Sequence, residues 1–365
     1  MTTNEISQLP TILSILDTIA GEEESMRNNK RYGFFFSNLG SEDKFEIKQE
    51  SQNGPWVLEP TSSCFNSYFR GQYEYHDNCC PTIFRNNKKN EKKDNIDRFI
   101  DRLRSSEFEL LLMDHPFVKL IYNEGIVLNN HRENILIPLK VDYLGLAQHY
   151  ELETDMLDFT NDKWVAAFFA TCKKENGNYV PMDSKGYGVF YRYSLPIETF
   201  FPQEVHSIQK KKFNVIGLQP FKRPAEQKGF ALNMEEGENL DNVRGIQKYY
   251  FRHDKLAAEI IYNRMNQGKS LFPEDALVEL ASKIKSSKKI SNNAFQLAYK
   301  KYPVEQMDED ILRKGCIGRG IKFINYPVVH FLKNIDRTFK RDWEKHDKDD
   351  FFSKIVYRST YEPQV

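Results

Sequence analysis

Side chains able to take part in acid–base or hydrogen-bond chemistry are concentrated just before an apolar run of the sequence. Four of them stand between positions 149 and 160: His149, Asp155, Asp158 and Thr160. The run 164–170, Trp-Val-Ala-Ala-Phe-Phe-Ala, follows and is expected to be buried. A buried polar group without a hydrogen-bond partner costs about 1–3 kcal/mol. These side chains therefore indicate either a structural hydrogen-bond network or a functional site.

Asp158 and Thr160 directly precede a predicted helix that begins after Asn161 or Asp162. The side chain of Asp158 or of Thr160 could cap that helix. Such a cap stabilises a helix by about 0.5–2 kcal/mol. A helix N-terminus also carries partial positive charge, so the same position could bind an anion. His149 lies at the inner end of the preceding predicted helix, where a structural core histidine and a functional base are alternatives.

Arg70 ends the strand-forming run 67–69 and precedes Gly71. A guanidinium beside a glycine suits an anion clamp in which the ligand reaches the backbone, and a salt bridge with a loop carboxylate is the structural alternative. Glu226 and Gln227 open a predicted strand that contains Gly229. A glycine inside a strand indicates either the close approach of a ligand or a bulge.

The composition is that of a folded protein without an extreme charge. The 365 residues are 40% apolar and include 27 Phe and 19 Tyr, which is ample for one large domain or two ordinary ones. Lys plus Arg and Asp plus Glu both number 52, so overall charge gives no support for a nucleic-acid or membrane-surface role. The 5 cysteines lack metal-ligand spacing, so no metal is expected. The sequence shows no signal peptide or membrane span, and we expect a cytoplasmic protein with reduced thiols.

Periodicity predicts an α+β fold in which an antiparallel or mixed sheet is flanked by helices, with helical N- and C-terminal extensions. The spacing of Ile96, Phe99, Ile100 and Leu103 is that of an amphipathic helix capped by Asp94 or Asn95. Further helices are expected over 9–20, 139–150, 162–172, 255–267 and 273–284, and strands over 67–70, 187–193, 213–218 and 227–232. We divide the chain into an N-terminal extension (1–59), a central domain (60–288) and a C-terminal helical extension (289–365).

Several motifs together resemble the FRG domain family, which is named for its Phe-Arg-Gly motif. In order they are Phe69-Arg70-Gly71-Gln72, Pro81-Thr-Ile-Phe-Arg85, Gln148-His149-Tyr150, Leu157-Asp158-Phe159-Thr160 with the run 166–170, Arg223 with Gln227-Lys-Gly229-Phe230, and Ser270-Leu-Phe-Pro273. The resemblance covers about residues 60–285 and implies a bacterial protein. Members usually show Pro-Thr-Arg before Leu-Leu-Asp, whereas this chain has Glu153-Thr-Asp155-Met156. A basic residue that would help bind phosphate is missing there.

The motif order is also similar to that of NAD-dependent ADP-ribosyltransferases of the Arg–Ser–Glu type. That resemblance implies that Arg70 holds the phosphates or ribose of NAD, that Gly71 exposes backbone to nicotinamide, and that Thr160 braces the pocket. The predicted strand at Gln227 would contact the nicotinamide ribose. The candidate catalytic residues are Arg70, Asp158, Thr160, Glu226 and Gln227, and the candidate NAD-binding residues are Phe69, Gly71, Gln72, His149, Gly229 and Phe230.

The implied chemistry requires a carboxylate that stabilises an oxocarbenium-like sugar. Those transferases carry Gln-x-Glu, whereas this chain has Gln227-Lys228-Gly229. Glu226 is one position away from Gln227. A shift of one residue on a strand moves a side chain to the opposite face. Asp158 or Glu151 would have to supply the carboxylate instead.

The leading hypothesis is an ADP-ribosyltransferase-like toxin or defence effector that uses NAD and modifies a protein or nucleic acid. The alternative is a non-catalytic module that binds a nucleotide, nucleic acid or protein through the same cleft, with basic segments at 85–93, 210–212 and 283–289. A third interpretation is a buried polar network formed by Arg70, His149 and Asp158 that only fixes the fold.

Overall fold

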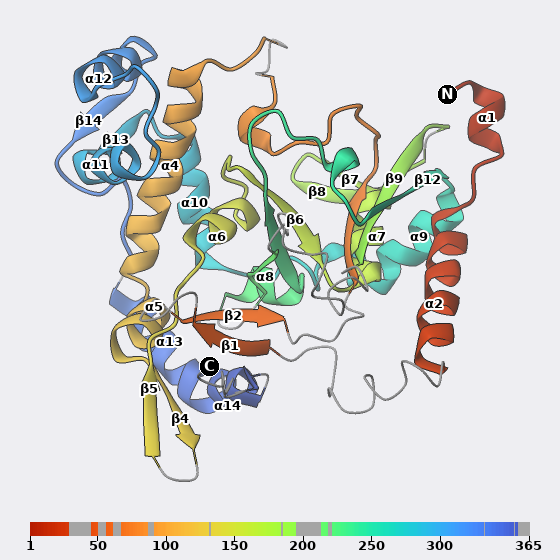
Figure 1. The fold of residues 1–365 in the computed structure, drawn as a ribbon, viewed down its shortest axis with the longest axis horizontal. Coiled ribbons are helices and arrows are strands. Elements are labelled where there is room, and N and C mark those ends of the chain that lie inside the picture. Colours follow the sequence, from red (N-terminus) through yellow and green to blue (C-terminus); the bar gives the residue numbers. More distant parts are fainter. Residues whose placement is uncertain are drawn as a thin grey trace, which may run out of the picture.

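A six-stranded sheet lies at the centre of the computed structural model (Figure 1). The structure describes residues 1–28, 45–49, 56–60, 67–86, 91–130, 133–183, 185–194, 213–217, 221–331, 333–353 and 355–356. The predicted basic segment 210–212 lies outside the described residues, as do positions 87–90 of the segment 85–93.

All neighbouring strands of the central sheet are antiparallel. Their order is β10 (Phe213–Val215), β11 (Gly229–Asn233), β6 (Met156–Thr160), β3 (Ser67–Gln72), β9 (Tyr187–Ser194) and β12 (Ile246–Arg252). Helices flank this sheet, so the predicted α+β class is confirmed.

Strands β3 and β6 meet at a single residue pair, Phe69 with Thr160. In contrast, β3 pairs with β9 over its whole length, from Ser67 to Gln72, and β6 pairs with β11 from Met156 to Thr160. The sheet therefore consists of two well-paired halves joined at one point. Beyond that point the facing edges of β3 and β6 have no strand ladder between them in the described structure.

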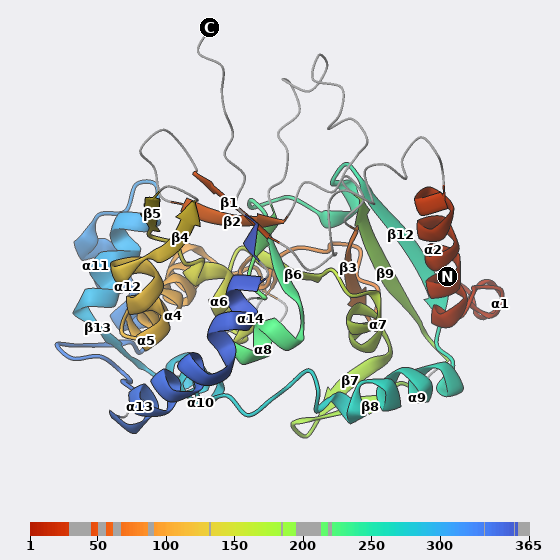
Figure 2. The same ribbon diagram turned by 90° about the horizontal axis from the view of Figure 1, so that it is seen from below.

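One half of the sheet, formed by β3, β9 and β12, is covered by α2 (Ile12–Asn28), α7 (Lys163–Thr171) and α9 (Lys255–Arg264) (Figure 2). Helix α2 buries the stripe Ile12, Ile15, Leu16 and Ile19, which has the spacing of one helix face. Burying a side chain of this size contributes about 1.5–3 kcal/mol. This contact with the sheet fixes the position of α2.

The other half, formed by β6, β10 and β11, packs against α6 (Tyr143–His149) and α8 (Lys222–Glu226). Helix α10 (Ala276–Ser286) lies nearby and packs against α4 (Asn95–Met113). Asp94 caps α4 as predicted, because its side chain accepts a hydrogen bond from the backbone N–H of Asp97. The far side of α4 packs against α11 (Asn292–Lys301) and α12 (Glu309–Gly318) in a separate apolar cluster.

Smaller elements complete the described chain. The parallel pair β13 (Lys289–Ser291) and β14 (Lys322–Ile324) accompanies α11 and α12. The others are α1 (Thr3–Ser7), α5 (Pro116–Val118), α13 (Lys333–Asp342), α14 (Lys348–Ser353), the sheet β15 (Ile355–Val356), β1 (Phe45–Gln49) and β2 (Trp56–Pro60), and the hairpins β4 (Ile126–Asn130)–β5 (Glu133–Ile137) and β7 (Cys172–Glu175)–β8 (Asn178–Pro181).

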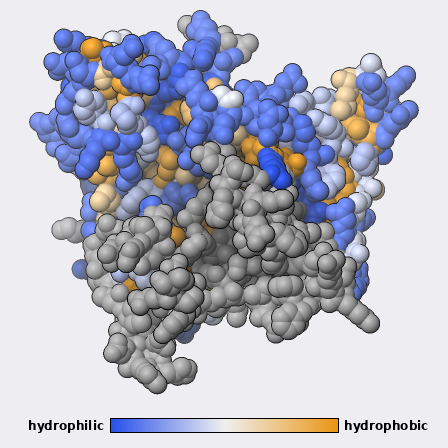
Figure 3. All heavy atoms as spheres, in the orientation of Figure 1, coloured by the Kyte–Doolittle hydropathy of each residue, from blue (hydrophilic) through white to orange (hydrophobic). Residues whose placement is uncertain are grey.

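The surface seen in Figure 3 is mostly hydrophilic over the described residues, with apolar side chains in separate small patches. None of the described helices combines the length and apolar character that crossing a membrane requires.

The predicted strand over 227–232 is wrong at its beginning. Glu226 is the last residue of α8 and Gln227 is its C-cap, so β11 begins only at Gly229. Pro224 lies inside the first turn of α8, a position that proline tolerates well. Lys228 then has a positive φ of 46°, which ends the helix. The strand argument about which face Glu226 occupies therefore does not apply.

Gly71 allows α7 to lie directly on β3. A Cβ added at Gly71 would stand 1.9 Å from the carbonyl oxygen of Ala166 and 2.7 Å from the Cβ of Ala170. The alanines of the run 166–170 thus let the backbone of α7 lie close to β3. Close packing against the helix, rather than exposure of backbone to a ligand, accounts for this glycine.

Replacement of Gly71 by Ala should lower the free energy of unfolding by about 3 kcal/mol, because the added methyl group meets backbone that cannot move aside. Urea denaturation measures the change. Gly21→Ala is the matched control, since no atom lies within 4 Å of the added Cβ and alanine favours the α2 helix by up to about 1 kcal/mol. Equal midpoints for the two variants would contradict the close packing of α7 on β3.

Candidate functional site

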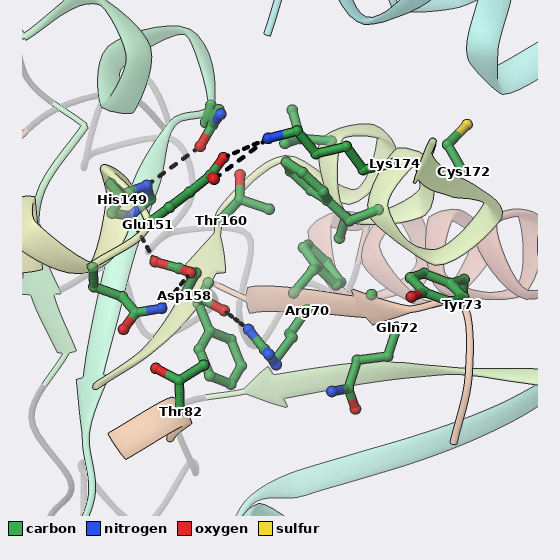
Figure 4. Close-up of a pocket in the computed structure, with 18 of the residues that line it drawn as sticks. Arg70, Gln72, Tyr73, Thr82, His149, Glu151, Asp158, Thr160, Cys172 and Lys174 are labelled. Carbon is green, nitrogen blue, oxygen red and sulfur yellow. Dashed lines mark hydrogen bonds and ion pairs between the residues drawn. The ribbon is translucent and has the colours of Figure 1, made fainter. Parts of the chain in front are cut away.

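A cavity of about 550 Å³ opens where the two halves of the sheet diverge. This volume is within the range of small-molecule sites. Its walls come from β3, the short 3-10 helix Thr82–Phe84, the end of α6, strand β6, helix α7 and residues near α8. Figure 4 shows side chains from these elements pointing toward one another across it.

Eight of the eleven predicted site residues line this cavity: Phe69, Arg70, Gly71, Gln72, His149, Asp158, Thr160 and Gln227. The other three do not. Glu226 is exposed on α8, Phe230 is buried against Tyr68 with ring centroids 4.8 Å apart, and Gly229 lies behind the ring of His149. The side chain that packs on Gly229 is thus an imidazole, which accounts for the glycine without a bulge or a ligand.

Arg70 reaches across the gap between β3 and β6. Its Nη1 donates a hydrogen bond to the backbone carbonyl oxygen of Asp158, at 2.8 Å (Figure 4). Its buried Nε has no hydrogen-bond partner among the described residues. The predicted structural alternative, a salt bridge with a loop carboxylate, is not formed with any residue that the structure describes.

Arg85 is a second guanidinium on the same cavity, and it was predicted only as part of the basic segment 85–93 and of one family motif. Its Nε donates to the carbonyl oxygen of Cys80 at 2.9 Å. Burial lowers the pKa of Arg85, and the nearby charge of Arg70 lowers it further. Arginine nevertheless stays charged in proteins. Two cations that face one cavity, neither in an ion pair with a described acidic residue, favour the binding of an anion.

Asp158 offers a carboxylate oxygen to the cavity. Its Oδ2 accepts a hydrogen bond from Nε2 of Gln148 at 3.0 Å, whereas Oδ1 has no hydrogen bond with a described residue and lies 3.4 Å from Nε2 of His149. Neither Asp158 nor Thr160 caps α7, because the cap is Asp162. Thr160 instead accepts a hydrogen bond from the backbone N–H of Asp162 at 3.1 Å. The capping explanation for Asp158 is therefore wrong, and its carboxylate remains oriented toward the pocket.

Glu151 is engaged by cations. Helix α6 ends in a Schellman motif, in which the N–H of Glu151 donates to the carbonyl of Gln148 and the N–H of Leu152 donates to that of Ala147. This motif holds Glu151 at a φ of 66°. Its carboxylate pairs with Arg223 at 2.8 Å and Lys174 at 3.0 Å.

The pKa of Glu151 follows from these contacts. Burial raises it, but the hydrogen bonds and charges of Arg223 and Lys174 outweigh burial and lower it from 4.5 to about 2. Both partners are far from Glu151 in the sequence, Arg223 by 72 residues. The basic residues that line the cavity outside the predicted site residues are Arg85, Lys174, Arg223 and Lys285, of which Arg85 and Lys285 belong to the predicted basic segments; the acidic Glu74 and Glu153 line it as well. Arg85 and Arg223 both belong to motifs of the family resemblance, which is the signal that could have found them.

Polar atoms without hydrogen-bond partners accumulate at this cavity. Six lining residues carry such a buried atom within the described part of the chain: Arg70 Nε, Gln72 Oε1, Thr82 Oγ1, His149 Nε2, Asp158 Oδ1 and Arg223 Nε. Two of these atoms, His149 Nε2 and Asp158 Oδ1, lie 3.4 Å apart. Orphaned polar atoms are costly, so the other four favour a polar ligand at this cavity. In the ranges that the structure describes, no three His, Cys, Asp or Glu side chains gather as metal ligands would.

Glu151→Gln should reduce stability in a defined pH range. The pKa in the folded state lies below the unfolded value of 4.5, so the carboxylate stabilises the fold fully above pH 4.5 and loses this effect as the pH falls toward about 2. Because the side chain is 46% exposed, solvent screening limits the loss in the variant at pH 7 to about 1 kcal/mol.

Urea denaturation at several pH values measures this effect, with the exposed Glu305→Gln as the matched control. The stability difference between Glu151→Gln and the unmodified protein should shrink as the pH falls through this window. A difference independent of pH would show that the ion pairs of Glu151 are not its cause.

One comparison with known proteins finds a similarity that covers part of this site. The family model of the FRG domain matches residues 66–178. No curated protein and no solved structure matches the chain. The matched segment includes Arg70, Arg85, His149 and Asp158, whereas Arg223 and Gln227 follow it in the sequence. The segment that is similar to the FRG domain thus supplies the guanidiniums of Arg70 and Arg85 and the carboxylate of Asp158 to the cavity.

Proposed function

We propose that this cavity binds NAD and transfers its ADP-ribosyl group, as an ADP-ribosyltransferase does. The observation that carries the proposal is the presence of two guanidiniums, from Arg70 and Arg85, and the partly exposed carboxylate of Asp158 on one cavity. A guanidinium presents planar, paired donors that match phosphate oxygens. Arg70 and Arg85 would therefore hold the pyrophosphate.

The reaction breaks the bond between the ribose C1′ and the nicotinamide nitrogen. The bonding electrons pass to the positively charged ring nitrogen, so nicotinamide leaves as a neutral molecule and the sugar becomes oxocarbenium-like. A carboxylate placed beside this developing positive charge stabilises the transition state. Asp158 is our candidate for that role, because the carboxylate of Glu151 is bound by Arg223 and Lys174 and Glu226 lies outside the cavity.

A nucleophile then attacks C1′ and loses its proton to solvent or to a neighbouring base. Water as the nucleophile gives ADP-ribose, and a protein or nucleic-acid acceptor becomes ADP-ribosylated. Either outcome consumes NAD or alters a macromolecule, which is the reason for proposing a toxin or defence effector in the cytoplasm.

A non-catalytic nucleotide-binding module is the second candidate function. It is favoured by the hydrogen bond from Arg70 to the backbone of Asp158. This bond would hold β3 and β6 in place before a ligand binds. Such a module would need only the guanidiniums of Arg70 and Arg85, and the Asp158 carboxylate would then be dispensable.

Nicotinamide release from NAD, followed by chromatography, and NAD binding, followed by calorimetry, separate the two functions. Asp158→Asn should lower turnover by about 100-fold or more while binding changes little, because it removes a charge that matters in the transition state. Arg70→Ala should weaken binding by about tenfold or more, the effect of losing one charged hydrogen bond.

The matched controls are Asp17→Asn and Arg337→Ala, which change exposed residues on α2 and α13. Binding without nicotinamide release, unaffected by Asp158→Asn, would establish the non-catalytic module instead. Absence of both binding and release would refute NAD as the ligand.

A further inference from the structure

We infer that His149 is a positioning residue: as an imidazolium it pairs with the Asp158 carboxylate and fixes that carboxylate toward the cavity. The inference rests on the proposed function for its catalytic consequence, and the pairing can be measured without catalysis. His149 is 5% exposed and ends helix α6. Its Nε2 and the Oδ1 of Asp158 are 3.4 Å apart, and neither has a hydrogen-bond partner among the described residues.

Gln227 determines which nitrogen of His149 carries a proton. The Nε2 of Gln227 donates to the carbonyl oxygen of Leu271 at 3.1 Å, and a carbonyl can only accept. The amide is therefore oriented with its Oε1 toward Nδ1 of His149, at 3.3 Å. An oxygen acceptor there requires a proton on Nδ1. Nε2 then faces the carboxylate of Asp158. With a proton on Nε2 the contact joins an imidazolium and a carboxylate, whereas without that proton two lone pairs would face each other.

Gly229 fixes the place of the imidazole ring. A Cβ added at this glycine would lie 2.4 Å from Cε1 and 2.7 Å from Nε2 of His149. Any larger residue would therefore displace the ring. Because β11 pairs with β6 at Gly229 and Thr160, the strand that supports the ring is also the neighbour of the strand that carries Asp158.

The second oxygen of Asp158 is fixed in an analogous way. Gln148 donates to Oδ2 at 3.0 Å, and its own Oε1 accepts a hydrogen bond from the hydroxyl of Thr154 at 2.6 Å. Thr154 in turn accepts a bond from the backbone N–H of Met156 at 3.2 Å. The carboxylate is thus held by two neighbouring residues of α6, and each of these is connected to a backbone group.

Among the residues that the structure describes, one acidic group is in direct contact with the imidazole. From β6 this is Asp158; from α8 and β11 the facing groups are the neutral amide of Gln227 and the backbone of Gly229. On the same segment as His149, the hydroxyl of Tyr150 donates to Asp275, and Glu151 pairs with Arg223. These two charge-bearing pairs are satisfied internally, so Asp158 is the counter-ion of His149.

The catalytic consequence is a loss of rate without a loss of binding. Arg70 and Arg85 have no hydrogen bond with His149, so a change at position 149 leaves phosphate binding intact. A carboxylate displaced by about 1 Å from the sugar costs up to about 100-fold in rate. His149→Phe should therefore lower kcat for nicotinamide release by about 10- to 100-fold with KM nearly unchanged.

Two further variants distinguish positioning from packing. His149→Gln places an amide N–H near the position of Nε2 and should recover part of the rate that His149→Phe loses. Gly229→Ala displaces the ring without removing a polar group and should lower kcat as His149→Phe does. Gly21→Ala, which changes an open position on α2, is the control that should keep the rate of the unmodified protein.

Long-range ¹H–¹⁵N correlation spectra of the imidazole test the pairing without substrate. We expect protonated Nδ1 and Nε2 in the unmodified protein and a changed Nε2 resonance in Asp158→Asn, with Asp17→Asn as the control. An Nε2 resonance that is the same in Asp158→Asn and in the unmodified protein would overturn the pairing. An unchanged kcat in His149→Phe would overturn the positioning role and leave the proposed function intact. A protein that shows the pairing and never releases nicotinamide would instead overturn the proposed function.

Discussion

The contact on which the site depends is the single residue pair between Phe69 and Thr160. Continuous pairing of β3 with β6 would bring the strands about 4.8 Å apart along their length, and backbone groups would occupy the space between them. Since pairing stops after one residue, the edge of β3 after Phe69 and the edge of β6 before Thr160 face a cavity instead. The polar side chains at these edges, Arg70 and Asp158, become accessible to a ligand for the same reason.

Where β3 and β6 separate, backbone groups lose a strand partner, and polar side chains take its place. The carbonyl of Asp158 accepts its hydrogen bond from the Arg70 side chain rather than from a strand. Gln148 and His149, from the end of one helix, flank the carboxylate. The interpretation of Arg70, His149 and Asp158 as a polar network that fixes the fold is thus physically sound. The Nε of Arg70, however, has no hydrogen-bond partner among the described residues, and a purely structural network would not need such an atom.

Local patterns in the sequence predicted the elements well where a single face decides the structure. Helix α4 was predicted from its apolar spacing and from Asp94, and the helix after Asp162 from its alanine and phenylalanine face. The same reasoning extended β11 back over Glu226 and Gln227, because short apolar runs do not distinguish a strand from the turn of helix before it. Ion pairs between distant positions, such as Glu151 with Arg223, left no local pattern. The role of Arg85 depends on its distance from Arg70 in space, which spacing along the chain does not reveal.

The contact between Gly71 and α7 has a mechanical consequence. On that side of the cavity a helix backbone touches a strand backbone, so the wall that carries Arg70 has no compressible layer of side chains behind it. The opposite wall, β6 with β11, is joined to the first by one ladder pair and by the bond from Arg70 to Asp158. A ligand that captures the Arg70 guanidinium would remove one of these two links. Binding would then change the contacts between the sheet halves at the point where Phe69 pairs with Thr160.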